Sequence, residues 1–203
     1  MILTNNHRPN NDFHHSNPSD IAFRLMEAPP DNHYLVIYPN LTAARSMYGD
    51  FIKIQIEQRN VAILFLPFFE TTDKVRELLI IAGVDVFAHE RNGSLILLDF
   101  GKIIDNPYLG IPAAFGLKEF VNKIQSRVVG KTLVVIADMS IYKHMNKVED
   151  LLEYERLAHS DSETQQWKEL CLFHKADFDL MFTESQKRKI LEYHNGRTFL
   201  VEG

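Results

Sequence analysis

The chain of 203 residues has a single cysteine and no long hydrophobic run, and each absence excludes a class of protein. With Cys171 alone, no intrachain disulfide can form, and the apolar stretch ELCLF around it favours a buried thiol over a nucleophile. The longest apolar run, residues 61–69, is far shorter than the ~20 residues that cross a bilayer. The first residues contain no apolar segment typical of a secretory signal, so we expect a cytoplasmic protein.

Basic segments and metal-binding motifs are also scarce. The formal net charge is −5, which gives no electrostatic reason to expect direct binding to nucleic acid or to an anionic membrane. The nine histidines show no ligand spacing on a common helix, and HERNG (89–93) lacks the second histidine of the zinc motif HExxH. The sequence therefore predicts neither a metal ion nor a cofactor.

A phosphate-binding loop is missing from the place where a RecA-like domain carries it. Residues 33–51 read as a buried strand that runs into a helix, but their turn contains no glycine cluster and no lysine. The GKT triplet at 130–132 precedes a strand, and Gln125 stands where a phosphate loop needs its first glycine. This nucleotide-binding layout without its phosphate loop favours ligand binding or sensing over hydrolysis.

The remaining composition is that of one α/β domain behind a flexible arm. The apolar content of 45% can fill a single core, which we assign to residues 33–203. The arm, residues 1–32, is rich in Asn, His and Pro near its start, and its segment 19–28 can form a short helix.

Short apolar runs alternate with longer amphipathic stretches after residue 33, which is typical of a three-layer fold with a mostly parallel sheet. The Asn-Gly pair at 92–93 favours a hairpin, so we expect an antiparallel edge in a sheet of about seven strands. The predicted strands are 33–38, 61–66, 84–87, 94–99, 131–137, 169–174 and 197–201. The predicted helices are about 41–58, 71–82, 113–128, 146–158 and 183–194, and they cover both faces of the sheet.

Polar and aromatic residues follow three of these strands, at the edge where open α/β sheets bind ligands. Asp138 and Ser140 follow the strand at 131–137, Tyr38 ends the first strand, and Pro67 and Phe68 follow the second. Asp138 either orients a ligand or caps the loop that follows it. The segment FLPFF (65–69), at the exit of the second strand, can wall an apolar cavity.

Two further residues have ambiguous roles. His33 opens the first strand, where a histidine either has a structural role or lines the pocket. Glu155 falls four residues after Leu151, on the apolar stripe of a predicted helix. A buried carboxylate must be paired or protonated, so Glu155 either reaches water at the edge of the stripe, which we favour, or enters a polar pocket.

Several segments in a fixed order resemble one family, the MEDS domain, which is the sensory domain of methanogens and methylotrophs associated with the DcmR regulator. The resemblance implies a RecA-related domain without a phosphate loop that senses small molecules. The matching segments are HYLVIYPN (33–40), VAILFLP (61–67), AGVDV (82–86), TLVVIADMS (132–140), LLEYERL (151–157), LCLFHKADF (170–178) and ILEYHNG (190–196).

The resemblance also implies ligand-binding roles for particular side chains. The strand-opening histidine, the acidic residue before Met-Ser and the Tyr-Glu pair fall on His33, Asp138, Tyr154 and Glu155. The family commonly has Gly-Glu where this chain has Ala137-Asp138, and often a tryptophan where this chain has Ile141-Tyr142. These departures leave the identity of the ligand open.

We therefore expect a non-enzymatic sensory domain for signal transduction or transcriptional regulation, with a small organic ligand at the carboxyl edge of its sheet. Its protein partner would be a histidine kinase or a transcription regulator, and self-association into a homo-oligomer is compatible with the sequence. An adaptor or scaffold without a small ligand is the alternative, and a residual nucleotide hydrolase that uses Asp138 ranks below both.

Overall fold

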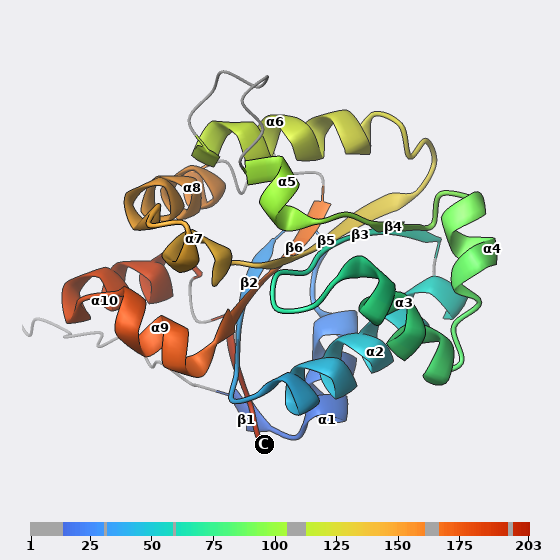
Figure 1. The fold of residues 1–203 in the computed structure, drawn as a ribbon, viewed down its shortest axis with the longest axis horizontal. Helices are drawn as coiled ribbons and strands as arrows, with labels where there is room; N and C mark the ends of the chain where they lie inside the picture. The colour runs from blue at the N-terminus through green and yellow to red at the C-terminus, as the bar shows by residue number, and fades with distance from the viewer. Residues whose placement is uncertain (1–13, 31, 59, 105–112, 161–166, 195–196) are drawn as a thin grey trace, which may run out of the picture.

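A single parallel sheet forms the middle layer of the molecule, with helices on both faces (Figure 1). The computed structural model describes residues 14–30, 32–58, 60–104, 113–160, 167–194 and 197–203. The α/β class and the parallel sheet agree with the prediction.

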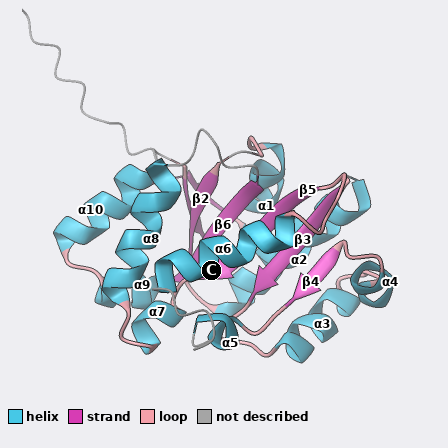
Figure 2. Ribbon diagram, turned by 90° about the horizontal axis from the view of Figure 1, so that it is seen from above, coloured by secondary structure: helices cyan, strands magenta, loops and turns pink. Residues whose placement is uncertain are grey.

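The sheet has seven strands in the order β1-β7-β2-β6-β5-β3-β4, and every pair of neighbours is parallel. Figure 2 looks onto the sheet from the side covered by α6. The strands are β1 (His14–Ser16), β2 (His33–Tyr38), β3 (Val61–Leu66), β4 (Leu95–Leu97), β5 (Thr132–Asp138), β6 (Trp167–His174) and β7 (Thr198–Val201).

Two groups of helices cover the two faces of the sheet. On the first face lie α1 (Pro18–Glu27), α2 (Leu41–Gln58), α3 (Thr72–Ile81) and α4 (Val86–Arg91). On the second face lie α5 (Phe100–Ile104), α6 (Ala113–Gln125), α7 (Ile141–His144), α8 (Val148–Ser160), α9 (Lys175–Met181) and α10 (Glu184–Tyr193).

The sheet is buried on both faces, which explains the unbroken apolar runs of its strands. Successive side chains of a strand point to opposite faces. In β2, Tyr34 and Val36 therefore belong to the core under α1 and α2, whereas Leu35 and Ile37 belong to the core under α8 and α9.

The predicted antiparallel edge is wrong. Residues 84–87 do not form a strand, because Asp85 caps the start of α4 by accepting a hydrogen bond from the Ala88 amide. The turn at 92–93 then joins α4 to β4, which pairs in parallel with β3. The predicted set of strands is therefore wrong in one member. The sheet contains β1, which was not predicted, and it does not contain a strand at 84–87.

The predicted arm at 1–32 extends too far into the folded part of the chain. β1 lies beside β7, and α1 buries Ile21, Ala22 and Leu25 completely against α2. The helix expected at 19–28 is thus present as α1, and the rest of the predicted arm, residues 1–13, falls outside the described residues.

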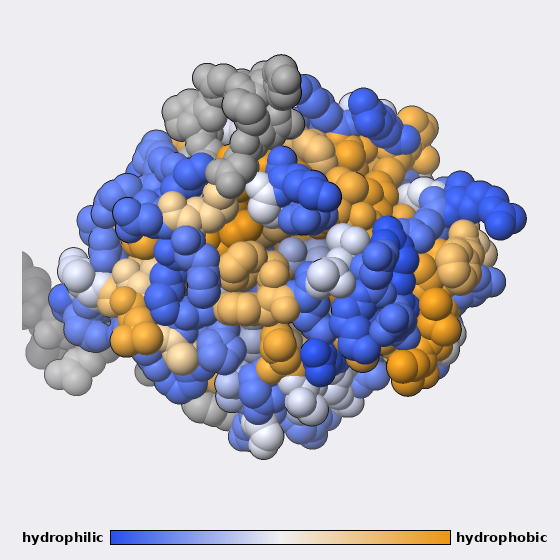
Figure 3. Space-filling view, in the orientation of Figure 1, coloured by the Kyte–Doolittle hydropathy of each residue, from blue (hydrophilic) through white to orange (hydrophobic). Residues whose placement is uncertain are grey.

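Among the described residues, no helix combines the length and the apolarity needed to span a membrane. The surface of the molecule is not uniformly polar, however. Figure 3 shows apolar surface over α3 and α4, the helices that carry the exposed side chains of Ile80, Ile81 and Phe87.

Candidate functional site

Asp138 is the buried polar centre of the carboxyl edge of the sheet. The Tyr38 hydroxyl donates a hydrogen bond to Asp138 Oδ2 over 2.9 Å, and the Ser140 amide donates to Oδ1 over 3.2 Å. The Ser140 hydroxyl in turn accepts a hydrogen bond from the His174 amide. The structure thus brings together three of the predicted site residues, on β2, β5 and the turn before α7.

The position of Asp138 follows from the topology. The chain leaves β3 toward β4 through α3 on one face, and it leaves β5 toward β6 through α8 on the other. Two adjacent strands with diverging connections leave a crevice at their carboxyl ends, the usual ligand site of open α/β sheets.

Burial has a strong effect on this carboxyl group. It raises the pKa of Asp138 from 3.8 to about 7, although the hydrogen bonds from Tyr38 and Ser140 act in the opposite direction. Burial also raises the pKa of Tyr38, so its hydroxyl stays protonated and remains a donor. Burial therefore favours the protonated form of Asp138 up to a much higher pH than for an exposed carboxyl group.

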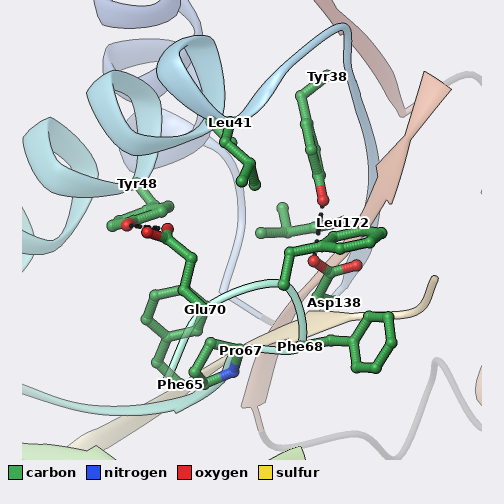
Figure 4. Close-up of a pocket in the computed structure, with 11 residues that line it drawn as sticks. Tyr38, Leu41, Tyr48, Phe65, Pro67, Phe68, Glu70, Asp138 and Leu172 are labelled. Carbon is green, nitrogen blue, oxygen red and sulfur yellow. Dashed lines mark hydrogen bonds between the residues drawn. The ribbon is translucent and has the colours of Figure 1, made fainter. Parts of the chain in front are cut away.

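The cavity beside Asp138 is small. Tyr38 points at Asp138 on one side, Tyr48 meets Glu70 on the other, and Pro67 and Phe68 lie below them (Figure 4). Its volume is about 20 Å³, which is room for one water molecule. Pro67 and Phe68 line this cavity as predicted, but the cavity as it stands cannot hold an organic ligand.

Neither of the two segments considered for phosphate binding has the contacts of a phosphate site. The Asn40 side chain accepts a hydrogen bond from the Ala43 amide and so caps the start of α2, where a phosphate loop would expose its amides. The Lys131 ammonium of the GKT triplet donates to Ser94 Oγ and to the Asn92 carbonyl. Both features are structural, as the sequence indicated for the triplet.

A larger groove lies at the same edge of the sheet, between α9, α10 and the ends of β2 and β7. Its volume is about 330 Å³, near the lower limit of typical small-molecule sites. Its apolar floor and its charged rim are formed by Ile37, Phe178, Leu191, Leu200, Lys175, Asp179, Glu184, Lys187 and Arg188.

On the rim of this groove, one cation has no partner among the described residues. Lys175 pairs with Asp179 over 2.7 Å, and Lys187 pairs with Glu184 over 2.9 Å. Arg188 makes no ion pair or hydrogen bond within the described part of the chain. The groove is therefore apolar at its base and positively charged at one point of its rim.

The other predicted site residues, His33, Tyr154 and Glu155, do not lie at the carboxyl edge. His33 is the first residue of β2, so it lies at the amino edge of the sheet, and Tyr154 and Glu155 come from α8 on the second face. Glu155 has no exposed surface, so the favoured interpretation that it reaches water is wrong and the polar pocket is correct.

His194 completes this second polar group. Glu155 Oε2 lies 3.5 Å from His33 Nε2 and 3.5 Å from His194 Nε2, and the two imidazole rings lie 4.2 Å apart. His194 Nδ1 lies 2.8 Å from the Ile190 carbonyl oxygen. Since a carbonyl only accepts, Nδ1 carries the hydrogen.

The ionisation of this group is governed by its burial. Burial lowers the pKa of both His33 and His194 to about 4, with smaller contributions from neighbouring charged groups, so both rings are neutral at pH 7. Burial raises the pKa of Glu155. The Cys171 thiol approaches Glu155 as a weak donor, and its own pKa is raised by burial, which agrees with the predicted inert, buried cysteine.

A second carboxyl group lies in the same buried region. The Tyr154 hydroxyl donates a hydrogen bond to Glu169 Oε1, and Glu169 is the β6 neighbour of His33. Burial raises the pKa of Glu169 to about 7. Tyr154 thus positions Glu169 and does not contribute to the cavity at the carboxyl edge.

Sequence reasoning missed His194 and the groove beside Arg188. His194 lies in the segment ILEYHNG, and the KRK run at 187–189 contains Arg188. Neither local pattern shows what lies opposite in space, because the partners come from α8, α9 and β2.

Comparison with known proteins identifies no family: no family model matches the chain, and no curated protein matches it significantly. The resemblance to the MEDS domain stays a prediction.

Proposed function

We propose that this protein is a non-enzymatic sensory domain that binds a small organic molecule with an apolar body and an anionic end. The binding site in this proposal is the groove between α9 and α10, at the carboxyl edge of the sheet. The observation that carries the proposal is the volume of about 330 Å³ beside Arg188, a cation with no partner among the residues that the structure describes. The resemblance to the MEDS domain suggests a role in signal transduction or transcriptional regulation.

Size favours the groove over the cavity at Asp138. Small-molecule sites usually enclose a few hundred cubic ångströms. The groove reaches that range, whereas the cavity of about 20 Å³ does not. Ile37, Phe178 and Leu191 offer the ligand an apolar surface whose contact with water is costly.

Charge selects the class of ligand. The carboxylates Asp179 and Glu184 are neutralised by their lysine partners, so Arg188 is the group on the rim that can receive a new anion. Arg binds a carboxylate through two parallel N–H donors, which fixes the orientation of the ligand.

Ligand-induced thermal stabilisation tests the proposal. The probes are hexanoate and benzoate, compared with hexan-1-ol and benzyl alcohol as neutral counterparts of similar shape. At about a hundredfold excess over Kd, binding should stabilise the fold by ~2.7 kcal/mol. We expect the carboxylates to raise Tm and the alcohols to have a much smaller effect.

Two variants locate the binding site. Arg188→Gln should remove the preference for the carboxylates, and Leu191→Trp should fill the groove and remove binding of all four probes. Lys189→Gln is the matched control, because Lys189 is an exposed neighbour on α10 that does not line the groove. If none of the probes changes Tm, or if Arg188→Gln responds like the control, the proposal fails and the adaptor alternative gains.

A further inference from the structure

Three side chains of types that can bind metals lie close together between the sheet and the helices of its second face. His33 begins β2, Glu155 lies in the middle of α8, and His194 is the cap residue after the last residue of α10. Their exposed fractions are 1%, 0% and 0%, and one ligand atom from each lies within 4.8 Å of the other two. Such complete burial of three polar side chains requires compensation.

The hydrogen bonds of the three side chains do not compensate for this burial. His194 Nδ1 donates to Ile190, so Nε2 of the neutral ring presents a lone pair to Glu155. A carboxylate also presents lone pairs, and the separation of 3.5 Å is longer than a hydrogen bond. Within the described residues, His194 Nε2 and both nitrogens of His33 have no hydrogen-bond partner, and the two oxygens of Glu155 have none beyond the weak contact with the Cys171 thiol.

The distances fit a shared cation. Metal–ligand bonds of about 2.1 Å in a tetrahedral site place two ligand atoms roughly 3.4 Å apart. Glu155 Oε2 lies 3.5 Å from both histidine nitrogens. The Ile190 carbonyl that holds His194 Nδ1 is the kind of outer partner that orients a metal-binding histidine.

We propose that His33, Glu155 and His194 bind one Zn²⁺ ion, which joins the start of β2 to α8 and to the end of α10. Imidazole nitrogens with one carboxylate form a ligand set that zinc takes, whereas Mg²⁺ and Ca²⁺ prefer oxygen ligands. The ion would be the positively charged partner that the buried Glu155 carboxylate lacks. It would also accept one nitrogen lone pair from each of the two imidazole rings.

The burial of all three ligands determines how the ion enters. Because the side chains have almost no exposed surface, the site is loaded while the chain folds. The experiment therefore starts from protein unfolded in denaturant with EDTA and freed of metal. It is then refolded with Zn²⁺ or with EDTA and dialysed, and zinc is counted by mass spectrometry of the digested protein.

We expect about one zinc per chain after refolding with Zn²⁺, and a higher Tm than for protein refolded with EDTA. Glu155→Gln and His194→Gln should each lower the retained zinc at least about tenfold. His159→Gln is the matched control, because His159 is half-buried on the same helix and contacts the Tyr193 carbonyl instead. It should retain zinc like the wild type.

Refolding of the wild type with Co²⁺ gives a readout that does not depend on the folding of any variant. A tetrahedral site produces intense visible absorption, and an octahedral surface complex produces weak absorption. Weak absorption, or zinc retention by Glu155→Gln equal to that of the control, would show that the histidines of the surface and of residues 1–15 bind the metal and would overturn the proposal.

Discussion

At the scale of single residues, the burial of Asp138 makes the free energy of unfolding depend on pH. Its folded pKa of about 7 lies above the unfolded value of 3.8, so the folded state binds more protons between these two values. The stability from this group is fully present below pH 3.8 and is lost as the pH rises through 7. The difference of about three pKa units corresponds to a loss of roughly 4 kcal/mol.

Asp138→Asn should remove this pH dependence, because an amide stays neutral throughout. We expect the free energy of unfolding of the variant, minus that of the wild type, to increase between pH 4 and pH 8. Urea titrations at several pH values measure this difference, with the exposed Asp73→Asn as control. A difference that is constant with pH would mean that Asp138 is ionised in the fold at all these values.

At the scale of elements, α10 contributes to both the groove and the buried polar group of His33, Glu155 and His194. Its side chains at 187, 188 and 191 line the groove, and its cap residue His194 belongs to the buried polar group. The first turn of α10 is held by a capping box, in which Thr183 accepts from the Gln186 amide and Gln186 accepts from the Thr183 amide.

Thr183→Ala should cost about 1 kcal/mol of stability, because it leaves the Gln186 amide without its partner. Chemical denaturation measures the change, and it should appear as a lower midpoint with an unchanged m-value. Ser185→Ala, which alters an exposed residue in the same turn, should change the free energy of unfolding by less than about 0.5 kcal/mol. Equal effects of the two substitutions would refute a specific role of the cap.

At the scale of the whole molecule, Lys168 ties the beginning of the chain to the middle of the sheet. Its ammonium donates to the carbonyl oxygens of Leu25 and Ala28, over 2.7 Å and 2.6 Å, at the end of α1. The side chain is buried, and the carboxyl end of a helix stabilises a cation. Residues 140 and more positions apart are thereby held in contact.

Lys168→Met should destabilise the fold by about 1–3 kcal/mol, because one buried and one partly buried carbonyl group lose their donor. We expect the loss to be concentrated at α1, so limited proteolysis should cut the chain near residues 28–32 sooner than in the wild type. Lys74→Met, at an exposed position of α3, is the control. Cleavage at the same rate in both variants would show that α1 is held by its apolar contacts alone.

The sequence by itself determined the local features of this protein. The strands at 33–38 and 61–66 match the prediction residue for residue, and Asp138 ends its strand as expected. Unbroken apolar runs identify strands buried on both faces, and strand ends identify an edge, because these properties depend on neighbours along the chain. The burial of Cys171 follows from the same pattern.

Only the tertiary structure decided what meets in space. β1 pairs with β7, although residues 14–16 contain no apolar run from which a strand could be predicted. The sheet separates His33 from Asp138, whereas helix packing joins His33 to Glu155 and His194. Contacts between distant segments depend on which faces pack together, and a single sequence records the period of each face but not its partner.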